Sequence, residues 1–186
     1  MPKAAIFLDR DGVLNSETRG AFVRTPEEFQ WLPGAREGVA ELCQAGWPVV
    51  LITNQSGIGR GLYTPDDLNA IHAKMEGDLA AYGAKLAAIY ACPHVDSDAC
   101  LCRKPLPGML YQAAADLDLD LPRSTFVGDA QRDAQAGRAA GCRVVAVTSG
   151  LQSADDVAAW ETAPDAVFPT LQEAAAWLNA ERASHE

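Results

Sequence analysis

Two aspartates one residue apart, Asp9 and Asp11, are the first side chains of the chain whose types and spacing could support chemistry. They follow the apolar run Ile6–Leu8, which predicts a buried parallel strand, and open α/β sheets bind ligands just beyond the carboxyl ends of such strands. An extended backbone would point both carboxylates to the same side. Because two carboxylates at one site repel each other, they require a cation between them or a shared proton. Taken alone, this motif also fits a polar turn after a strand, with no chemical role.

Three further polar segments stand at or close to other predicted strand ends. Residues 53–57 offer the hydroxyl of Thr53 followed by backbone N–H groups that can cradle phosphate oxygens. Arg103 and Lys104 bring two cations to the start of a predicted helix, and a third segment, residues 129–133, begins and ends with aspartate. Each segment alone also fits a helix cap or an exposed charge. Together they predict one polar site at the carboxyl edge of a parallel sheet.

A second group of side chains, Cys92, His94, Cys100 and Cys102, has the composition of a metal centre. Three thiolates and one imidazole form a closed set of four ligands that suits tetrahedral structural Zn²⁺. We therefore expect a zinc ion that orders residues 92–104, the zinc loop, and so delivers the cations at its end to the polar site. Reduced side chains in a loop without metal are the alternative.

The remaining cysteines and histidines receive no chemical role. Cys43 and Cys142 lie in apolar stretches, where a cysteine usually acts as a small buried hydrophobe. His72 on a predicted helix and His185 near the C-terminus are expected to be exposed to solvent.

Alternating strand and helix patterns position these segments. Apolar runs predict strands over residues 4–8, 48–53, 87–91, 125–128, 143–148 and 166–168. The clearest helix signal is the N-cap Thr64, followed by Pro65 and the capping-box acid Asp67, with Gly83 as the stop. Further helices are expected over residues 107–118 and 131–140 and after Ser153 and Thr170. The alternation predicts an α/β fold with a doubly wound, mainly parallel, Rossmann-like sheet covered on both faces.

The length of 186 residues fits one domain, residues 1–186, with a frayed polar tail over about residues 181–186. The sheet does not explain residues 15–32 or the zinc loop, and loops of such length in a compact domain are usually functional. Neither the segment after Asp11 nor the one between Thr53 and Arg103 is long enough to form a separate cap domain. We therefore expect residues 15–32 and the zinc loop to exclude water from the site.

Acidic side chains outnumber basic ones by 25 to 15, which gives a formal net charge of −10. A surface of this charge repels nucleic acids and anionic membranes, so neither is expected as a partner. No apolar run reaches the length of a membrane span, and the N-terminus lacks a signal pattern. We expect a cytoplasmic monomer that can bind an anion only where cations and backbone N–H groups gather locally.

The four polar segments, in this order on an α/β alternation, resemble the haloacid-dehalogenase (HAD) superfamily of phosphohydrolases. The resemblance implies that Asp9 attacks phosphorus and forms an aspartyl-phosphate, which divides hydrolysis into two easier steps. Asp11 would protonate the leaving oxygen and then deprotonate the attacking water. Thr53 and Lys104 would hold the phosphoryl oxygens.

The same resemblance implies a catalytic Mg²⁺. Its ligands would be the carboxylates of Asp9 and Asp129 and the backbone carbonyl of Asp11, an all-oxygen set that suits this cation. Asp133 would orient a metal-bound water or Lys104. The cation would also offset the repulsion between the acids and the charge on the transferred group.

Within that superfamily, residues 3–150 resemble the D-glycero-D-manno-heptose-1,7-bisphosphate 7-phosphatases. The similar segments are residues 9–13, 22–23, 53–61, 92–94 and 100–109. The resemblance implies removal of the 7-phosphate of a phosphorylated sugar, in the synthesis of nucleotide-activated heptose for bacterial surface glycans such as the lipopolysaccharide core. Arg103 would recognise the sugar bisphosphate. The other substrate contacts would be Glu17, Thr18, Arg19, Gly20, Asn54, Gln55 and Ser56.

Two other functions stay open at this stage. The short zinc-loop spacer, residues 95–99, also resembles the sister group, the histidinol-phosphate phosphatases, whereas Pro107, Gly108 and Met109 favour the heptose group. A non-catalytic binding module ordered by zinc is a third function, which the presence of every expected catalytic residue disfavours. The preferred heptose anomer is not indicated by the sequence.

Overall fold

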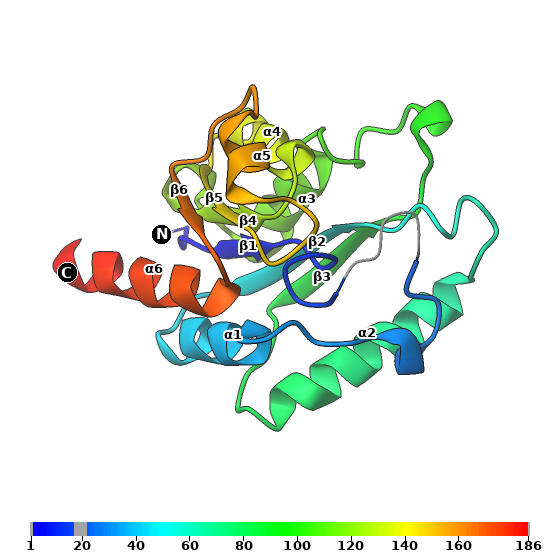
Figure 1. Ribbon diagram of the computed structural model, residues 1–186, viewed down its shortest axis with the longest axis horizontal. Helices are drawn as coiled ribbons and strands as arrows, with labels where there is room; N and C mark the ends of the chain where they lie inside the picture. Colours follow the sequence, from blue (N-terminus) through cyan, green and yellow to red (C-terminus); the bar gives the residue numbers. More distant parts are fainter. Residues whose placement is uncertain (1, 17–21, 186) are drawn as a thin grey trace.

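In the computed structural model, which describes residues 2–16 and 22–185, six parallel strands form one sheet in the order β3-β2-β1-β4-β5-β6 (Figure 1). The strands are β1 (Ile6–Leu8), β2 (Val49–Asn54), β3 (Ala88–Cys92), β4 (Thr125–Gly128), β5 (Arg143–Val147) and β6 (Ala166–Phe168). All six predicted strands are confirmed, with ends that differ by at most two residues. The strand order reverses at β1, which pairs with β2 on one side and β4 on the other, so a crevice for a ligand is expected there.

Helices connect the strands. They are α1 (Ala35–Gln44), α2 (Pro65–Ala80), α3 (Gly108–Leu117), α4 (Gln131–Ala139), α5 (Ala154–Ala158) and α6 (Leu171–His185), with short 3-10 helices η1 (Pro26–Glu28), η2 (Asp96–Asp98) and η3 (Leu121–Arg123). The capping boxes predicted at Thr64 and Ser153 are formed. Helix α1 was not predicted, because it begins after Gly34, which has no side chain to cap it.

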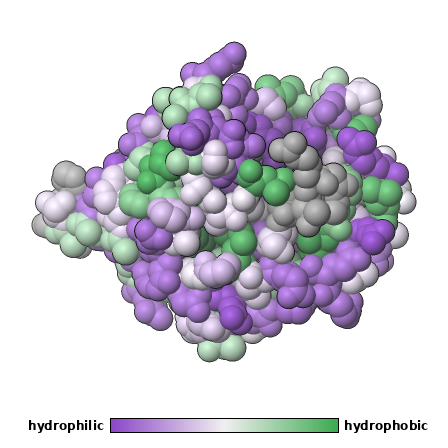
Figure 2. Space-filling view, viewed as in Figure 1, coloured by the Kyte–Doolittle hydropathy of each residue, from purple (hydrophilic) through white to green (hydrophobic). Residues whose placement is uncertain are grey.

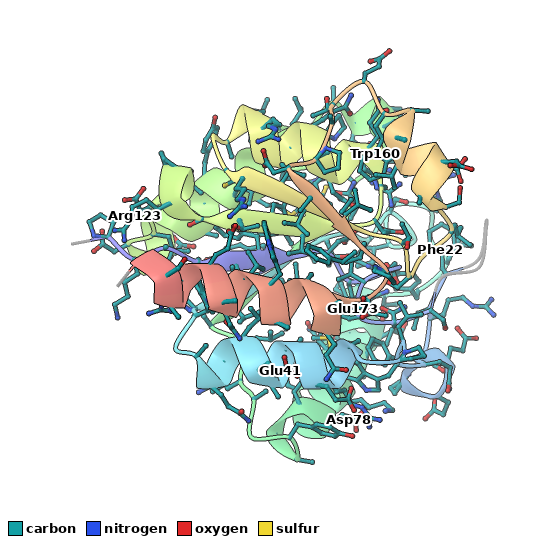
Figure 3. All side chains as sticks on the ribbon, turned by 60° about the vertical axis from the view of Figure 1, so that its left-hand side comes forward. Phe22, Glu41, Asp78, Arg123, Trp160 and Glu173 are labelled. Atoms are coloured by element: carbon teal, nitrogen blue, oxygen red, sulfur yellow. The ribbon has the colours of Figure 1, made fainter. Side chains whose placement is uncertain are left out.

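The sheet separates two apolar layers, and successive residues of a strand enter opposite layers. In β1, Ile6 and Leu8 pack with residues of α1, α2 and α6, whereas Phe7 packs with residues of α3 and α4. Helices α1 and α6 lie side by side on the first face (Figure 3). The doubly wound α/β sheet predicted from the sequence is therefore confirmed.

Residues 181–185 continue α6, and the Glu181 carboxylate accepts hydrogen bonds from the guanidinium of Arg143 on β5. The expected exposure of His72 is wrong. His72 is buried on α2, where burial lowers its pKa to about 4. The imidazole therefore stays neutral at physiological pH.

The surface is largely polar. Figure 2 shows one face on which hydrophilic residues predominate and apolar residues form small, separate patches. Within residues 2–16 and 22–185, none of the helices has the length and apolar character needed to cross a bilayer.

Docking of α6 on the sheet gives a stability prediction. Leu178 is buried in the layer shared with α1, so Leu178→Ala should reduce the free energy of unfolding by about 2–5 kcal/mol. Urea unfolding followed by circular dichroism measures this change. Ser184→Ala, at the exposed end of the same helix, should change stability by less than about 0.5 kcal/mol. Equal, small effects of both substitutions would show that α6 is not docked.

Candidate active site

Asp9 follows β1 at the point where the strand order reverses, and its side chain is buried. Its Oδ1 atom accepts a 2.7 Å hydrogen bond from the backbone N–H of Arg10 and lies 2.9 Å from Nζ of Lys104. Burial raises the pKa of Asp9 to about 6; Lys104 opposes this shift and Asp133 adds to it. At neutral pH the group is therefore a buried carboxylate beside a single ammonium.

Lys104 connects three parts of the fold through its buried ammonium. Nζ lies 2.9 Å from Asp9 and 2.7 Å from Asp133, and it donates a 2.9 Å hydrogen bond to the carbonyl of Ile52 in β2. All three N–H groups of the ammonium are thus engaged. Burial alone would lower the pKa of Lys104, but the carboxylates of Asp133 and Asp9 raise it above the ordinary value. The side chain therefore remains a cation.

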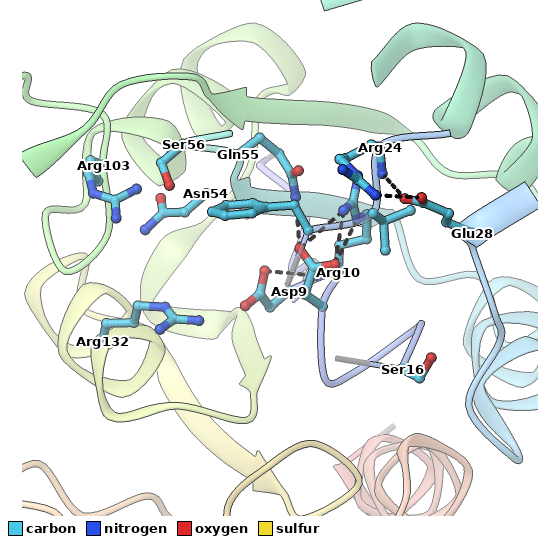
Figure 4. Close-up of a pocket in the computed structure, with 13 residues that line it drawn as sticks. Asp9, Arg10, Ser16, Arg24, Glu28, Asn54, Gln55, Ser56, Arg103 and Arg132 are labelled. Atoms are coloured by element: carbon cyan, nitrogen blue, oxygen red, sulfur yellow. Dashed lines mark hydrogen bonds and ion pairs between the residues drawn. The ribbon is translucent and has the colours of Figure 1, made fainter. Parts of the chain in front are cut away.

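Asn54, expected to contact substrate, holds the backbone of Lys104. Its Nδ2 donates to the carbonyl of Lys104 at 3.0 Å, and its Oδ1 accepts from the N–H of Lys104 at 3.1 Å. This reciprocal pair joins the end of β2 to the end of the zinc loop. Asn54 also lines the pocket described below, so it lies at the site while it holds the backbone of Lys104 (Figure 4).

The carboxylate of Asp11 is held by three side chains. Its Oδ1 accepts 2.9 Å hydrogen bonds from Nη2 of Arg10 and Nδ2 of Asn15, and its Oδ2 accepts one of 2.9 Å from Nε2 of Gln55. Burial alone would raise the pKa of Asp11, but these partners lower it, Arg10 most strongly. Asp11 is therefore ionised and fixed in orientation in the free protein.

Asp9 and Asp11 line one pocket, as expected, but not because of strand alternation. Strand β1 ends at Leu8, and the carbonyl of Arg10 accepts hydrogen bonds from the three N–H groups of residues 13–15. Gly12 adopts a positive φ of 83° within this turn. The turn, rather than an extended chain, brings the second carboxylate back to the site.

Three carboxylates, those of Asp9, Asp129 and Asp133, have oxygens within 4.8 Å of one another. The backbone leaves little space around Asp129, because a Cβ at Gly12 or Gly150 would lie 2.0 or 2.1 Å from its Oδ2. Buried oxygen donors gathered in this way fit a hard divalent cation such as Mg²⁺. Asp133 contacts Lys104, one of the two contacts considered for it from the sequence.

Cys92, His94, Cys100 and Cys102 converge as the spacing predicted. The three sulfurs lie 3.2 to 3.7 Å apart, and Nδ1 of His94 lies 3.5 Å and 3.3 Å from the sulfurs of Cys92 and Cys102. Ligands on a tetrahedral Zn²⁺ with Zn–S bonds of 2.3 Å would be separated by about 3.8 Å. The group therefore fits zinc with little rearrangement.

The zinc loop also fixes Arg103. Nε of Arg103 lies 2.5 Å from a carboxylate oxygen of Asp96, and Nη1 donates to the carbonyl of His94 at 3.3 Å. Arg103 thereby reaches the pocket from the loop that the metal ligands close.

The pocket above these groups has a volume of about 420 Å³. Its lining residues are Asp9, Arg10, Asp11, Ser16, Phe22, Val23, Arg24, Glu28, Asn54, Gln55, Ser56, Arg103 and Arg132. Figure 4 shows Arg103 and Arg132 on one side of Asp9, and the ion pair between Arg24 and Glu28 on the other. Four arginines at one pocket, in a chain of net charge −10, favour an anionic ligand.

Several lining residues were not identified from the sequence. Arg10 and Arg132 stand inside the acidic motifs, directly beside Asp11 and Asp133, so their positions in the sequence are a usable signal. Asn15, which is buried against Asp11 and is not among the lining residues, has no such signal in the sequence. Of the expected substrate contacts, Asn54, Gln55, Ser56 and Arg103 line the pocket. Glu17, Thr18, Arg19 and Gly20 lie outside the residues that the structure describes.

A parallel sheet with an aspartate after the first strand, a buried lysine and an acidic cluster at its carboxyl edge defines a phosphohydrolase of the HAD class. A family model described as HAD-hydrolase-like matches residues 101–174. The chain is 50% identical over 145 residues to D-glycero-β-D-manno-heptose-1,7-bisphosphate 7-phosphatase of Bordetella bronchiseptica, covering 78% of this chain and 80% of that protein. It is 42% identical over 150 residues to the Pseudomonas aeruginosa enzyme of that name, covering 81% and 84%. The chain belongs to this phosphatase family.

Solved structures agree with this assignment. The crystal structure of D,D-heptose 1,7-bisphosphate phosphatase from Bordetella bronchiseptica, complexed with magnesium and phosphate, has a TM-score of 0.88 and 44% identity over 96% of this chain and 99% of that one. The phosphatase of the same name from Burkholderia thailandensis has a TM-score of 0.71 and 34% identity, covering 95% and 98%. The family resemblance predicted from the sequence is confirmed.

The two hydrogen bonds between the Asn54 side chain and the Lys104 backbone predict that a substitution of Asn54 affects catalysis indirectly. Asn54→Ala should lower kcat about 10- to 100-fold, because the lysine backbone loses both partners that place its ammonium beside Asp9. Steady-state kinetics measure the loss. Asn179→Ala, in the middle of α6, removes a comparable pair of side-chain hydrogen bonds and should leave kcat within about twofold. A wild-type kcat in Asn54→Ala would contradict the positioning role.

The Cys₃His group predicts one tightly bound zinc per chain. Cys100→Ser should lose the bound zinc. It should also lower kcat/KM at least tenfold, because Arg103 and Lys104 belong to the loop that the zinc orders. Elemental analysis and kinetics measure both losses. Cys43→Ser, whose sulfur lies outside the group, should keep the metal. A folded, fully active wild-type protein without zinc would contradict this prediction.

Proposed function

We propose that this protein is a Mg²⁺-dependent phosphatase that removes the 7-phosphate of D-glycero-β-D-manno-heptose 1,7-bisphosphate. The observation that carries the proposal is the buried carboxylate of Asp9, which lies beside Lys104 at the base of an arginine-lined pocket. The names of its relatives support the substrate, and most of those compared specify the β-anomer. The reaction would serve the synthesis of nucleotide-activated heptose for a surface glycan such as lipopolysaccharide.

In the proposed first step, a carboxylate oxygen of Asp9 attacks phosphorus while the bond from phosphorus to the C7 oxygen breaks. Asp11, which must take up a proton when the substrate binds, passes that proton to this oxygen as it leaves as an alcohol. In the second step, water attacks the aspartyl-phosphate, its proton passes to Asp11, and the bond from phosphorus to Asp9 breaks. The ammonium of Lys104, released from Asp9 as that carboxylate attacks, and the hydroxyl of Thr53 would hold phosphoryl oxygens in both steps.

Two metals complete the proposed enzyme. The carboxylates of Asp9 and Asp129 and the backbone carbonyl of Asp11 would hold Mg²⁺, with Asp133 placed behind them to hold Lys104. When bound, the cation neutralises charge on the phosphoryl group and offsets the repulsion between the carboxylates. Zn²⁺ at the Cys₃His group would have a structural role.

The second phosphate of the substrate explains the arginines of the pocket. Once one phosphoryl group lies on Asp9, a group at C1 must lie several ångströms away, and Arg103 and Arg132 line the pocket on one side of Asp9. Guanidinium groups bind phosphate through paired hydrogen bonds. Arg103 and Arg132 would therefore select a bisphosphate over a monophosphate.

Histidinol phosphate suits this pocket less well. It carries one phosphate, the group that would be removed, and an ammonium that the arginines of the pocket would repel. A non-catalytic binding module is disfavoured because the nucleophile, the acid and the lysine lie together in a hydrogen-bonded site. The proposal includes a single-domain, monomeric, cytoplasmic enzyme without a cap domain and without nucleic-acid or membrane partners.

A phosphate-release assay tests this function. With Mg²⁺ present, the β-anomer of heptose 1,7-bisphosphate should give a higher kcat/KM than the α-anomer or histidinol phosphate, with phosphate lost from C7. Asp9→Asn should lower turnover at least about 10³-fold, because the amide cannot form the covalent intermediate. Asp155→Asn, at an exposed position of α5, should leave turnover unchanged.

Two results would count against this function. Preference for histidinol phosphate would contradict the proposed substrate. Turnover retained in Asp9→Asn would contradict the proposed nucleophile.

A further inference from the structure

The amide of Gln55 is fully engaged with catalytic side chains. Its Nε2 donates one 2.9 Å hydrogen bond to Oδ2 of Asp11 and another of 2.9 Å to Oγ1 of Thr53. A primary amide has two N–H hydrogens, so neither is left for a substrate. The Thr53 hydroxyl oxygen is the acceptor in this bond, so its own hydrogen is not used in it. Gln55 is thus placed to orient both of these side chains.

This arrangement works only if the Gln55 amide keeps one of its two orientations. A flip would turn the carbonyl oxygen toward the carboxylate of Asp11, and two acceptors would then face each other. Tyr63 favours the observed orientation, since its hydroxyl donates a buried 2.6 Å hydrogen bond to Oε1 of Gln55. Burial raises the pKa of Tyr63 to about 12, so the phenol stays protonated and remains a donor at physiological pH.

The ring of Tyr63 is itself fixed by packing. It packs on the backbone of Gly57, where a Cβ would lie only 2.1 Å from the ring atom Cε1. The next residue, Thr64, forms the capping box that begins α2, and the side chain of Tyr63 is 6% exposed. Phe22 lies on the pocket side of the ring, with 6.5 Å between ring centroids. The Tyr63 hydroxyl therefore has little freedom to leave Gln55.

We propose that Tyr63 is a positioning residue that acts through Gln55 to hold the carboxylate of Asp11 in place as general acid. This inference rests on the proposed function, because it assumes that Asp11 protonates the leaving oxygen. It has a specific consequence for the substrate. An alkoxide is a poor leaving group and requires that proton, whereas p-nitrophenolate leaves readily without it.

The test compares kcat/KM for two substrates that differ in their leaving groups. Tyr63→Phe keeps the ring and removes only the hydroxyl. It should lower kcat/KM at least tenfold for a primary alkyl phosphate and less than threefold for p-nitrophenyl phosphate. Tyr111→Phe is the matched control, because it removes an exposed hydroxyl that bonds the carbonyl of Ala139; both of its kcat/KM values should stay unchanged.

A double-mutant cycle tests whether Tyr63 acts through Gln55. Gln55→Met removes the amide at similar size and should show the same selective loss on the alkyl phosphate. The combined variant should lose no more than Gln55→Met alone, because the tyrosine then has nothing left to orient. An equal loss on both substrates, no loss in Tyr63→Phe, or additive losses in the combined variant would overturn the proposal.

The wild-type protein separates this inference from the proposed function. The alkyl substrate is heptose 1,7-bisphosphate or histidinol phosphate, whichever the wild type hydrolyses faster, and both release a primary alcohol. A preference for histidinol phosphate would therefore contradict the proposed substrate and still allow the Tyr63 comparison. A wild-type enzyme that hydrolyses an alkyl phosphate, with no selective loss in Tyr63→Phe, would overturn the inference alone.

Discussion

The buried ammonium of Lys104 is the charge on which the rest of the site depends. It lies between the carboxylates of Asp9 and Asp133 and caps a carbonyl of β2, so it joins the ends of β1 and β2 to the start of α4. Without it, the buried carboxylates of Asp9 and Asp133 would lose the ammonium that pairs with both, which is strongly destabilising. The sheet alone brings these strand ends together, but a cation is needed for the acids to coexist. Both the stability of the fold and the proposed chemistry therefore require a cation at residue 104.

The zinc loop and Asn54 supply what a flexible lysine lacks. A lysine side chain has many rotamers, and directing its Nζ to two carboxylates requires a fixed backbone. Asn54 fixes that backbone from β2, while the Cys₃His group closes the loop just before it. Arg103, one residue earlier, is fixed by Asp96 and by the carbonyl of His94. One ordered loop thus presents two cations, with Lys104 beside Asp9 and Arg103 in the lining of the pocket.

The sequence predicted what local rules determine and missed what depends on tertiary contacts. All six strands follow from apolar runs, and the helix starts at Thr64 and Ser153 follow from capping residues. The Cys₃His group was found because its spacing is local. By contrast, the positions of Asn15 and Arg10 around Asp11 depend on the turn after β1. The bond from Asn54 to the Lys104 backbone joins residues fifty positions apart, and no local pattern indicates such a contact.

The pocket has two ends of different construction. The reacting end is built on strand ends and short turns, with Gly12 and Gly150 packed so closely around Asp129 that neither accepts a side chain. The opposite end is formed in part by Phe22, Val23, Arg24 and Glu28, from a connection outside the sheet. Sequence change can therefore accumulate at one end without disturbing the other. A substitution in this connection would reshape one side of the pocket and leave the acidic groups at the strand ends in place.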